Sequence, residues 1–258
     1  MSKEQASSPD VLIAIEKQLK LITAAIDRQT DAIAFHNLKD NVLEFHYEGQ
    51  PIRLYLPQGD YDYIQNAIMR SRTFYEETKL RAIRKTFDLR GKTVLDVGAN
   101  IGNHTLYFAS VCQAAKCISF EPNPHPAAIL RRNVELNALH NVEFRQCAIS
   151  DLPGALSFGR YSAKNIGATS YEDDITGAIP AHPVDDLINE AVHFIKIDVE
   201  GMAIRVLHGA RRTLSTCRPG LMIELFPAEF QEANSFLEDS GYKKIASLGA
   251  SNYLYGPA

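Results

Sequence analysis

Residues 92–105 constrain the fold more than any other stretch of this chain, and their sequence is KTVLDVGANIGNHT. The first half is apolar and rich in β-branched residues, which is typical of a buried strand. Gly98 and Gly102 then permit a tight turn, and an apolar run suited to a helix follows. The N–H groups of such a turn and helix start are unpaired, so they can bind a polar or anionic ligand. We therefore expect an open α/β sheet with a ligand beyond the carboxyl ends of its strands.

The rest of the chain continues this alternation of strands and helices. Strands are predicted at 93–97, 116–120, 142–148, 193–199 and 221–226, with a final pair at 243–248 and 252–255. Predicted helices occupy most of the intervals between them. The pattern predicts a doubly wound, mostly parallel sheet with right-handed crossovers and an antiparallel hairpin at its C-terminal edge.

The chain divides into three parts. Residues 1–38 predict an amphipathic helix, and residues 39–90 predict a β-hairpin followed by a helical lead-in that is broken near 71–73. Residues 91–258 form the main α/β domain. Within it, residues 151–184 are rich in glycine and interrupt the alternation. We expect them to form an irregular insertion, with one or two hairpins, that covers the ligand site.

The N-terminal helix carries a heptad repeat. Apolar residues follow a 3-4 spacing, and one polar residue, Gln29, occupies a position of the same series. The apolar members are Leu12, Ile15, Leu19, Ile22, Ile26 and Ile33. This spacing predicts either a homo-oligomer through residues 9–35, formed as a short coiled coil, or an amphipathic helix that packs on its own domain or on a partner.

Composition narrows the class of protein. The 258 residues are 45% hydrophobic and 22% charged, as in an ordinary globular protein. A net charge of −4 gives no reason to expect nucleic acid as the main partner. No stretch approaches the roughly 20 apolar residues of a membrane span, and the four cysteines form no C-x-x-C pair. We expect a cytoplasmic protein with reduced thiols.

Two acids next to the glycine turn indicate the cofactor. Glu121 ends the second strand, where a carboxylate can accept hydrogen bonds from the hydroxyls of a ribose. A dinucleotide site needs a second glycine where this chain has Asn100, and Asp96 before the turn is poorly suited to a pyrophosphate. An acid there suits a cationic amino-acid tail. The pattern favours S-adenosylmethionine over NAD.

The chain resembles the FkbM-type methyltransferases. The motifs that carry the resemblance run from about residue 74 to residue 226: FYE at 74–76, LDVGANIG at 95–102 followed by His104 and Thr105, FEPNP at 120–124, Asn133-x-x-x-Asn137, DDL at 185–187, and FIKIDVEG at 194–201 followed by VL-x-GA at 206–210. One departure is Ala203, where the family often has an acid.

The resemblance implies a class I fold and an S-adenosylmethionine-dependent O-methyltransferase that acts on a hydroxyl of a sugar, glycan or polyketide-like metabolite. It also implies which residues hold the cofactor. Asp96, Gly98, Asn100 and Gly102 would line its methionine end, Glu121 would hold the ribose with Asn123 beside it, and Ala148 and Ser150 would border the adenine.

The fourth predicted strand carries the candidate catalytic acids. Lys196, Asp198 and Glu200 alternate, which places them on one face of an otherwise apolar strand. Asp198 or Glu200 is our candidate for the base that takes the acceptor proton. The alternative is an ion pair with Lys196, because a buried charge needs a partner. His104 is a second candidate base or only a helix-start residue. Asp198 with Glu224 lacks a His or Asn partner at metal spacing, so no metal site is predicted.

The insertion carries the candidate acceptor contacts. The segment KNIGATS at 164–170 resembles the family's Asn-x-Gly-x-Ser loop, so Lys164, Asn165 and Ser170 either contact the acceptor or form a surface turn. Two other functions stay open from the sequence. One is a nicotinamide-dependent oxidoreductase, and the other is a non-catalytic nucleoside-binding module that works through the N-terminal helix.

Overall fold

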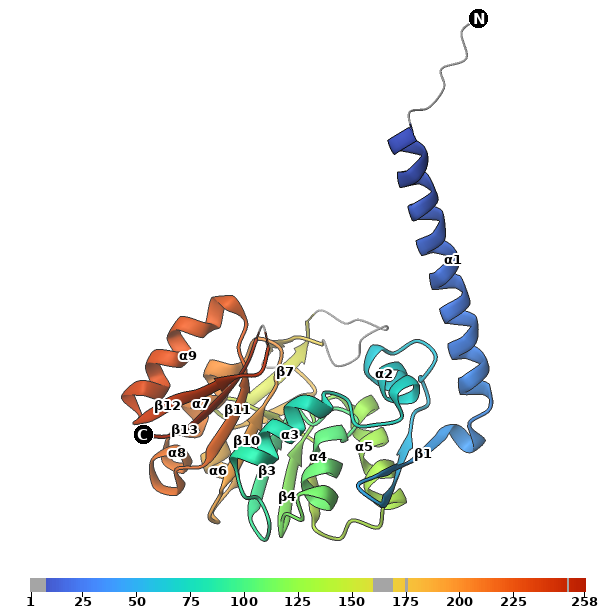
Figure 1. Ribbon diagram of the computed structural model, residues 1–258. Helices are drawn as coiled ribbons and strands as arrows, with labels where there is room; N and C mark the ends of the chain where they lie inside the picture. Colours follow the sequence, from blue (N-terminus) through green and yellow to red (C-terminus); the bar gives the residue numbers. More distant parts are fainter. Residues whose placement is uncertain (1–7, 160–168, 175, 250) are drawn as a thin grey trace, which may run out of the picture.

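A computed structural model describes residues 8–159, 169–174, 176–249 and 251–258 (Figure 1). Its centre is a seven-stranded sheet with the order β12-β13-β11-β10-β3-β4-β5. The strands are β3 (Thr93–Val97), β4 (Lys116–Phe120), β5 (Val142–Arg145), β10 (Phe194–Ile197), β11 (Gly220–Glu224), β12 (Tyr242–Ser247) and β13 (Asn252–Pro257). Five of them are parallel, and β13 pairs antiparallel with β11 and with β12. The predicted fold class is confirmed.

Both faces of the central strands β3, β4, β10 and β11 are covered, which explains why these strands are mostly apolar, whereas the outer strands β5 and β12 carry charged residues. Alternate residues of each strand face opposite layers: Val94 belongs to one core cluster and Leu95 to the other. The helices of the domain are α4 (Asn103–Leu106) with the π-helical turn η2 (Tyr107–Val111), α5 (Pro124–Leu136), α6 (Val184–Leu187), α7 (Ala203–Gly209), α8 (Arg211–Cys217) and α9 (Pro227–Asp239). The predicted helix over 203–214 is therefore two helices, which meet at Ala210.

The N-terminal part adds a long helix and a hairpin. Helix α1 (Ser8–His36) projects from the body in Figure 1, and η1 (Lys39–Asn41) leads from it to the antiparallel strands β1 (Val42–Tyr47) and β2 (Gln50–Tyr55). Helices α2 (Tyr63–Ser71) and α3 (Glu77–Thr86) follow, separated where the sequence predicts a break. Arg72, with a φ of 51°, ends α2 in a left-handed conformation. None of the helices in the described ranges combines the length and the apolar character of a membrane span.

Helix α5 holds the outer edge of the hairpin through the Asn133-x-x-x-Asn137 motif. The Oδ1 atom of Asn133 accepts a hydrogen bond from the Tyr55 N–H at 2.6 Å. Asn137 accepts from the Arg53 N–H at 2.9 Å and donates to the Arg53 carbonyl at 2.6 Å. The motif therefore fixes the hairpin on the main domain.

Two sequence predictions about strands are wrong in extent. The third strand ends at Arg145 instead of residue 148, because β5 is the edge strand and no outer neighbour holds the chain in the sheet. The fourth strand ends at Ile197, so Asp198 and Glu200 lie in the loop beyond it and do not alternate with Lys196 on one strand. Glu200 has a φ of 48°, which is a turn conformation.

The insertion is more regular than expected. Strands β6 (Ala148–Ile149), β7 (Gly154–Phe158), β8 (Tyr171–Asp173) and β9 (Ile179–His182) form a second sheet with the order β6-β9-β7-β8. Strand β7 pairs antiparallel with both β8 and β9, while β6 pairs parallel with β9. This sheet brings Tyr171 and Thr169 to the end of the central sheet where the ligand site lies.

Candidate active site

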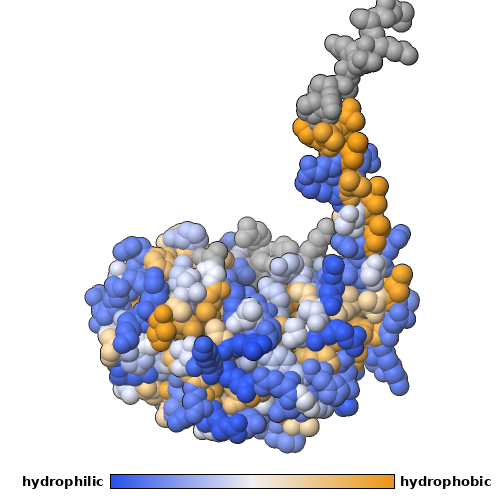
Figure 2. Space-filling model, in the orientation of Figure 1, coloured by the Kyte–Doolittle hydropathy of each residue, from blue (hydrophilic) through white to orange (hydrophobic). Residues whose placement is uncertain are grey.

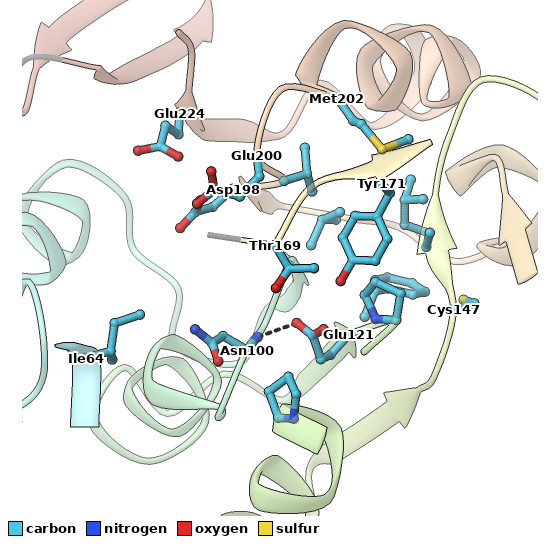
Figure 3. A pocket seen from close by; sticks show the side chains of 18 of the residues that line it. Ile64, Asn100, Glu121, Cys147, Thr169, Tyr171, Asp198, Glu200, Met202 and Glu224 are labelled. Atoms are coloured by element: carbon cyan, nitrogen blue, oxygen red, sulfur yellow. Dashed lines mark hydrogen bonds between the residues drawn. The ribbon is translucent and has the colours of Figure 1, made fainter. Parts of the chain in front are cut away.

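A cavity lies at the carboxyl ends of β3, β4, β10 and β11 (Figure 3). Its walls come from four regions: the strand ends, the N-terminal lead-in, the start of α5, and the second sheet. The residues that line the cavity include Tyr63, Tyr75, Glu76, Gly98, Asn100, Phe120, Glu121, Ala148, Ile149, Thr169, Tyr171, Asp198, Glu200 and Glu224. The position agrees with the general rule for open α/β sheets.

Beneath the cavity, Asp96 and Lys196 form a buried ion pair. They are register partners on neighbouring parallel strands, and Lys196 Nζ lies 3.2 Å from Asp96 Oδ1. Asp96 also accepts a hydrogen bond from the Thr105 hydroxyl at 2.6 Å, and Lys196 donates to the Gly98 carbonyl at 2.6 Å. Burial alone would lower the pKa of Lys196, but the charges of Asp96 and Asp198 raise it above its ordinary value. Asp96 is fully buried and does not line the cavity, so the structure places it under the predicted methionine end.

The glycine turn brings two loops into direct backbone contact. Gly98 has a φ of +78°, and a Cβ at this position would lie 1.8 Å from the carbonyl oxygen of Asp198. Gly102, with a φ of +86°, precedes α4, and a Cβ there would lie 3.0 Å from Leu130. Only Gly98 and Asn100 of this turn line the cavity; Gly102 does not.

The N–H groups of the turn have partners, contrary to the expectation that they are unpaired. The N–H groups of Gly98 and Ala99 donate to the Phe120 carbonyl at 3.0 and 2.9 Å. The Asn100 N–H donates to Glu121 Oε2 at 2.8 Å, as the dashed line in Figure 3 shows. The turn is thus tied to the end of β4, and its N–H groups at residues 98–100 do not form an anion site.

Glu121 is the acid that this turn fixes in place. Its second oxygen accepts from the Asn123 N–H at 2.8 Å, and the residue is only 6% exposed. Burial raises the pKa of Glu121 to about 7, although the hydrogen bonds from Asn123 and Asn100 oppose the shift. Asn123 is not at the cavity wall; its side chain caps α5 by accepting from the His125 N–H at 3.1 Å.

The other end of the cavity is largely apolar. Phe120, Ala148 and Ile149 line it, and Tyr171 from the second sheet covers it. Ser150, predicted beside Ala148 at the adenine, is buried behind the wall and donates to Asp151 at 3.0 Å. Among the predicted acceptor contacts, Ser170 does not line the cavity, and Lys164 and Asn165 lie outside the described residues.

Three carboxylates gather at the mouth, where Figure 3 shows Asp198, Glu200 and Glu224 side by side. One oxygen of each lies within 4.8 Å of the others. Asp198 Oδ2 is also 3.6 Å from Lys196 Nζ. Burial and then the charge and hydrogen bond of Asp198 raise the pKa of Glu224 to about 8. A pKa in this range keeps Glu224 largely protonated at neutral pH.

Comparison with known protein families identifies the family of this chain. Residues 96–244, more than half of the chain, match the family described as the methyltransferase FkbM domain. The chain belongs to the FkbM methyltransferase family.

The relatives of this chain are distant. Methyltransferase 1 of Beauveria bassiana is 25% identical in an alignment of length 177 that covers 58% of this chain and 71% of that protein. The 2-O-methyltransferase NoeI of Sinorhizobium fredii is 27% identical in an alignment of length 150 that covers 48% of this chain and 60% of NoeI. A crystal structure of FkbM from Methylobacillus flagellatus KT is 22% identical with a TM-score of 0.47, over 64% of this chain and 43% of that longer one.

This FkbM methyltransferase also has a cavity residue that the sequence prediction missed. Glu76, which precedes α3 with a φ of 58°, lines the cavity. His104 Nε2 lies 3.6 Å from its carboxylate, and Lys79 is hydrogen bonded to it. Burial would raise the pKa of Glu76, but His104 and Lys79 lower it to about 2. His104 itself, the second candidate base, is buried behind Glu76 and does not line the cavity. The only sequence signal for Glu76 is the FYE motif.

The charges of the cavity fit the cofactor that the family implies. Five of the described lining residues are acidic, namely Glu76, Glu121, Asp198, Glu200 and Glu224. None of the described lining residues is Lys, Arg or His. S-adenosylmethionine carries a sulfonium and an ammonium group, so this lining attracts it. The pyrophosphate of NAD would be repelled by the same carboxylates. The family and the charge of the site thus favour a methyl donor over a dinucleotide.

Proposed function

We propose that this protein is an S-adenosylmethionine-dependent O-methyltransferase whose acceptor is an uncharged hydroxyl compound, such as a neutral sugar, glycan or polyketide-like metabolite. The observation that carries the proposal is the Asp198–Glu224 pair at the mouth of an acidic cavity. NoeI, a relative, is named a 2-O-methyltransferase, which supports oxygen as the atom that is methylated.

The cavity residues divide the work of holding the donor. Glu121 would bind the ribose hydroxyls, since its oxygens keep lone pairs beyond those used by Asn100 and Asn123. Phe120, Ala148 and Ile149 would hold the adenine, and Glu76 with Asp198 would provide negative charge for the methionine end. When bound, S-adenosylmethionine supplies an electrophilic methyl group on a sulfonium centre.

Asp198 is the proposed proton acceptor. It lies in the loop after the central strand β10, and its side chain is 32% exposed, so an acceptor hydroxyl can reach it. The positive charge of Lys196 lies 3.6 Å from the Asp198 carboxylate, and Glu224 is the neighbouring carboxyl group. As the oxygen gains its methyl group, its hydroxyl proton passes to Asp198. Most of the acceleration would come from alignment of the reacting atoms, with the base adding about 10²–10⁴-fold.

The acidic mouth also limits the class of acceptor. A phosphorylated acceptor, whether a nucleotide sugar or a nucleic acid, would bring negative charge to Asp198, Glu200 and Glu224. A neutral polyol has no such penalty and can donate hydrogen bonds to the same carboxylates. The proposed methyl acceptor is therefore an uncharged hydroxyl compound.

Transfer from labelled S-adenosylmethionine tests the proposal directly. We expect label in neutral oligosaccharides or polyketides and little in nucleotide sugars or RNA. Calorimetry should show binding of S-adenosylmethionine that Glu121→Ala weakens strongly, while the exposed Glu232→Ala on α9 leaves it unchanged. Absence of binding would contradict the donor assignment. Binding without turnover on any acceptor would instead favour the non-catalytic module, and quenching by NADH alone would revive the oxidoreductase.

A further inference from the structure

We infer that the heptad face of α1, defined as Leu12, Ile15, Leu19, Ile22, Ile26, Gln29 and Ile33, binds the same face of at least one further copy of this chain in a parallel coiled coil. The six apolar residues of this face are between 49% and 64% exposed. Figure 2 shows apolar side chains along the projecting helix. Such a continuous exposed strip marks an interaction surface.

The structure shows which side of α1 faces its own body, and it is not the heptad face. With Leu12 at position a, Asp27, Asp31 and Phe35 take positions b, f and c. Arg70 of α2 forms ion pairs with Asp31 at 3.5 Å and with Asp27 at 3.9 Å, and Phe35 packs against the core cluster around the hairpin. The b, c and f side of residues 27–35 thus docks α1 on the body, while Ile13 and Leu21 on the same side farther from the body are 64% and 59% exposed, and the a and d side stays open to solvent along its length. Packing on its own domain therefore does not account for the repeat.

The residues that flank the heptad face suit self-association. Positions g are Val11, Gln18, Ala25 and Ala32, and positions e are Glu16, Thr23 and Thr30. Only Glu16 is charged, so neighbouring copies meet with little like-charge repulsion. Leu12 and Leu19 at position a with Ile15 and Ile22 at position d form a combination that favours more than two strands.

Gln29 selects the parallel arrangement. When the copies lie parallel and in register, Gln29 meets Gln29, and the two amides can bond to each other. An antiparallel pair centred on Ile22 would place Gln29 against Ile15 and leave its amide unpaired, which is unfavourable in an apolar interface.

A membrane surface is a poorer partner for this helix. The basic residues of α1 before His36 are Lys17, Lys20 and Arg28, and its acidic residues are Asp10, Glu16, Asp27 and Asp31. Helices that lie on anionic lipid usually have an excess of Lys and Arg on their polar face. This helix has no such excess.

Light scattering on the full-length protein after size exclusion tests the inference. We expect a mass at least twice that of one chain, reduced to one chain by Ile22→Asp. The matched control Ala24→Asp, at position f, should keep the wild-type mass. Circular dichroism and donor binding of Ile22→Asp should match the wild type, because the change lies outside the catalytic body.

Crosslinking tests the orientation. In a Cys217→Ser background, which removes the partly exposed thiol, Gln29→Cys should form an interchain disulfide on mild oxidation, and Arg28→Cys at position c should not. A monomeric wild type would overturn the inference, including the case where the monomer binds vesicles of phosphatidylcholine and phosphatidylserine. An oligomer in which Gln29→Cys never crosslinks would overturn the parallel arrangement.

Discussion

Asp96 and Asp198 lie at the ends of neighbouring strands and share one lysine, yet their surroundings differ, and we propose different roles for them. Asp96 is fully buried, 3.2 Å from Lys196 and bonded to Thr105. Asp198 is 3.6 Å from the same lysine, has a 32% exposed side chain, and borders Glu224. A buried carboxylate of this kind is structural, because the loss of its ion-pair partner would leave an uncompensated buried charge. A partly solvated carboxylate that lines the cavity beside a second carboxyl group can accept a proton from a substrate.

The largest expected effect separates the two acids by activity. Asp198→Asn should lower kcat by about 10²–10⁴-fold, because the proton acceptor is lost while the shape is kept. Steady-state transfer assays measure this, and urea unfolding should show nearly wild-type stability. Asp96→Asn is the matched control and should do the reverse, with the main loss in stability. Equal losses of kcat in the two variants would remove the distinction.

The next prediction tests the structural half of the comparison. Lys196→Met should lower the free energy of unfolding by about 3–5 kcal/mol, because it leaves Asp96 as an unpaired buried charge. Adding Asp96→Asn to this variant removes that charge and should restore much of the loss, as measured by urea denaturation. If the double variant is no more stable than Lys196→Met alone, the pair does not act as a unit.

Gly98 joins the two loops that carry these acids. Gly98→Ala should destabilise by about 2–4 kcal/mol, from the left-handed backbone and from the overlap of the new Cβ with the Asp198 carbonyl. Gly49→Ala is the control, since Gly49 has a φ of +82° with open space around it, and it should cost only about 1 kcal/mol. Denaturant unfolding of the two variants isolates the close approach; equal costs would mean that the loops separate freely.

The smallest effect is a pH dependence at Glu121. Its pKa in the folded chain is about 7, above the ordinary 4.5, so its contribution to stability is complete below pH 4.5 and is lost as the pH rises through 7. Glu121→Gln does not titrate. The free energy of unfolding of the wild type minus that of the variant should therefore fall by about 1–3 kcal/mol between pH 5 and pH 8.

Urea titrations without cofactor at both pH values measure this difference. Glu232→Gln, on the exposed side of α9, should show no such trend. A difference that rises with pH would mean that the carboxylate is more stable ionised than protonated at this site.

Local patterns predicted much of the fold and part of the site. The strands at 93–97 and 116–120 were placed correctly because buried parallel strands have short apolar runs. Glu121 was placed at the cavity because the end of a strand fixes its position. Gly98 and Asn100 also lie at the cavity, because the glycine turn directly follows the end of β3.

What the sequence did not predict depends on contacts between distant segments. Lys196 lies opposite Asp96 only because β10 is the neighbour of β3, and strand order is not a local property. Glu76 and Tyr171 reach the cavity from the lead-in and from the second sheet, so the strand-end motifs do not indicate them, and the FYE motif marks Glu76 without giving its place in the cavity. The unpaired turn N–H groups were also a local expectation, and Phe120 and Glu121 overturn it.

The hydrogen bonds between α5 and the hairpin depend on two distances that are nearly equal, one along the helix and one along the strand. Four residues of an α-helix advance about 6.0 Å, and two residues of a strand advance about 6.6 Å. The spacing of Asn133 and Asn137 along α5 therefore matches that of Tyr55 and Arg53 along β2. Their side-chain amides form hydrogen bonds with the backbone of β2, as the next strand of a sheet would. A strand from another molecule finds these backbone groups occupied, so the helix protects an edge that a two-stranded sheet would otherwise leave open to aggregation.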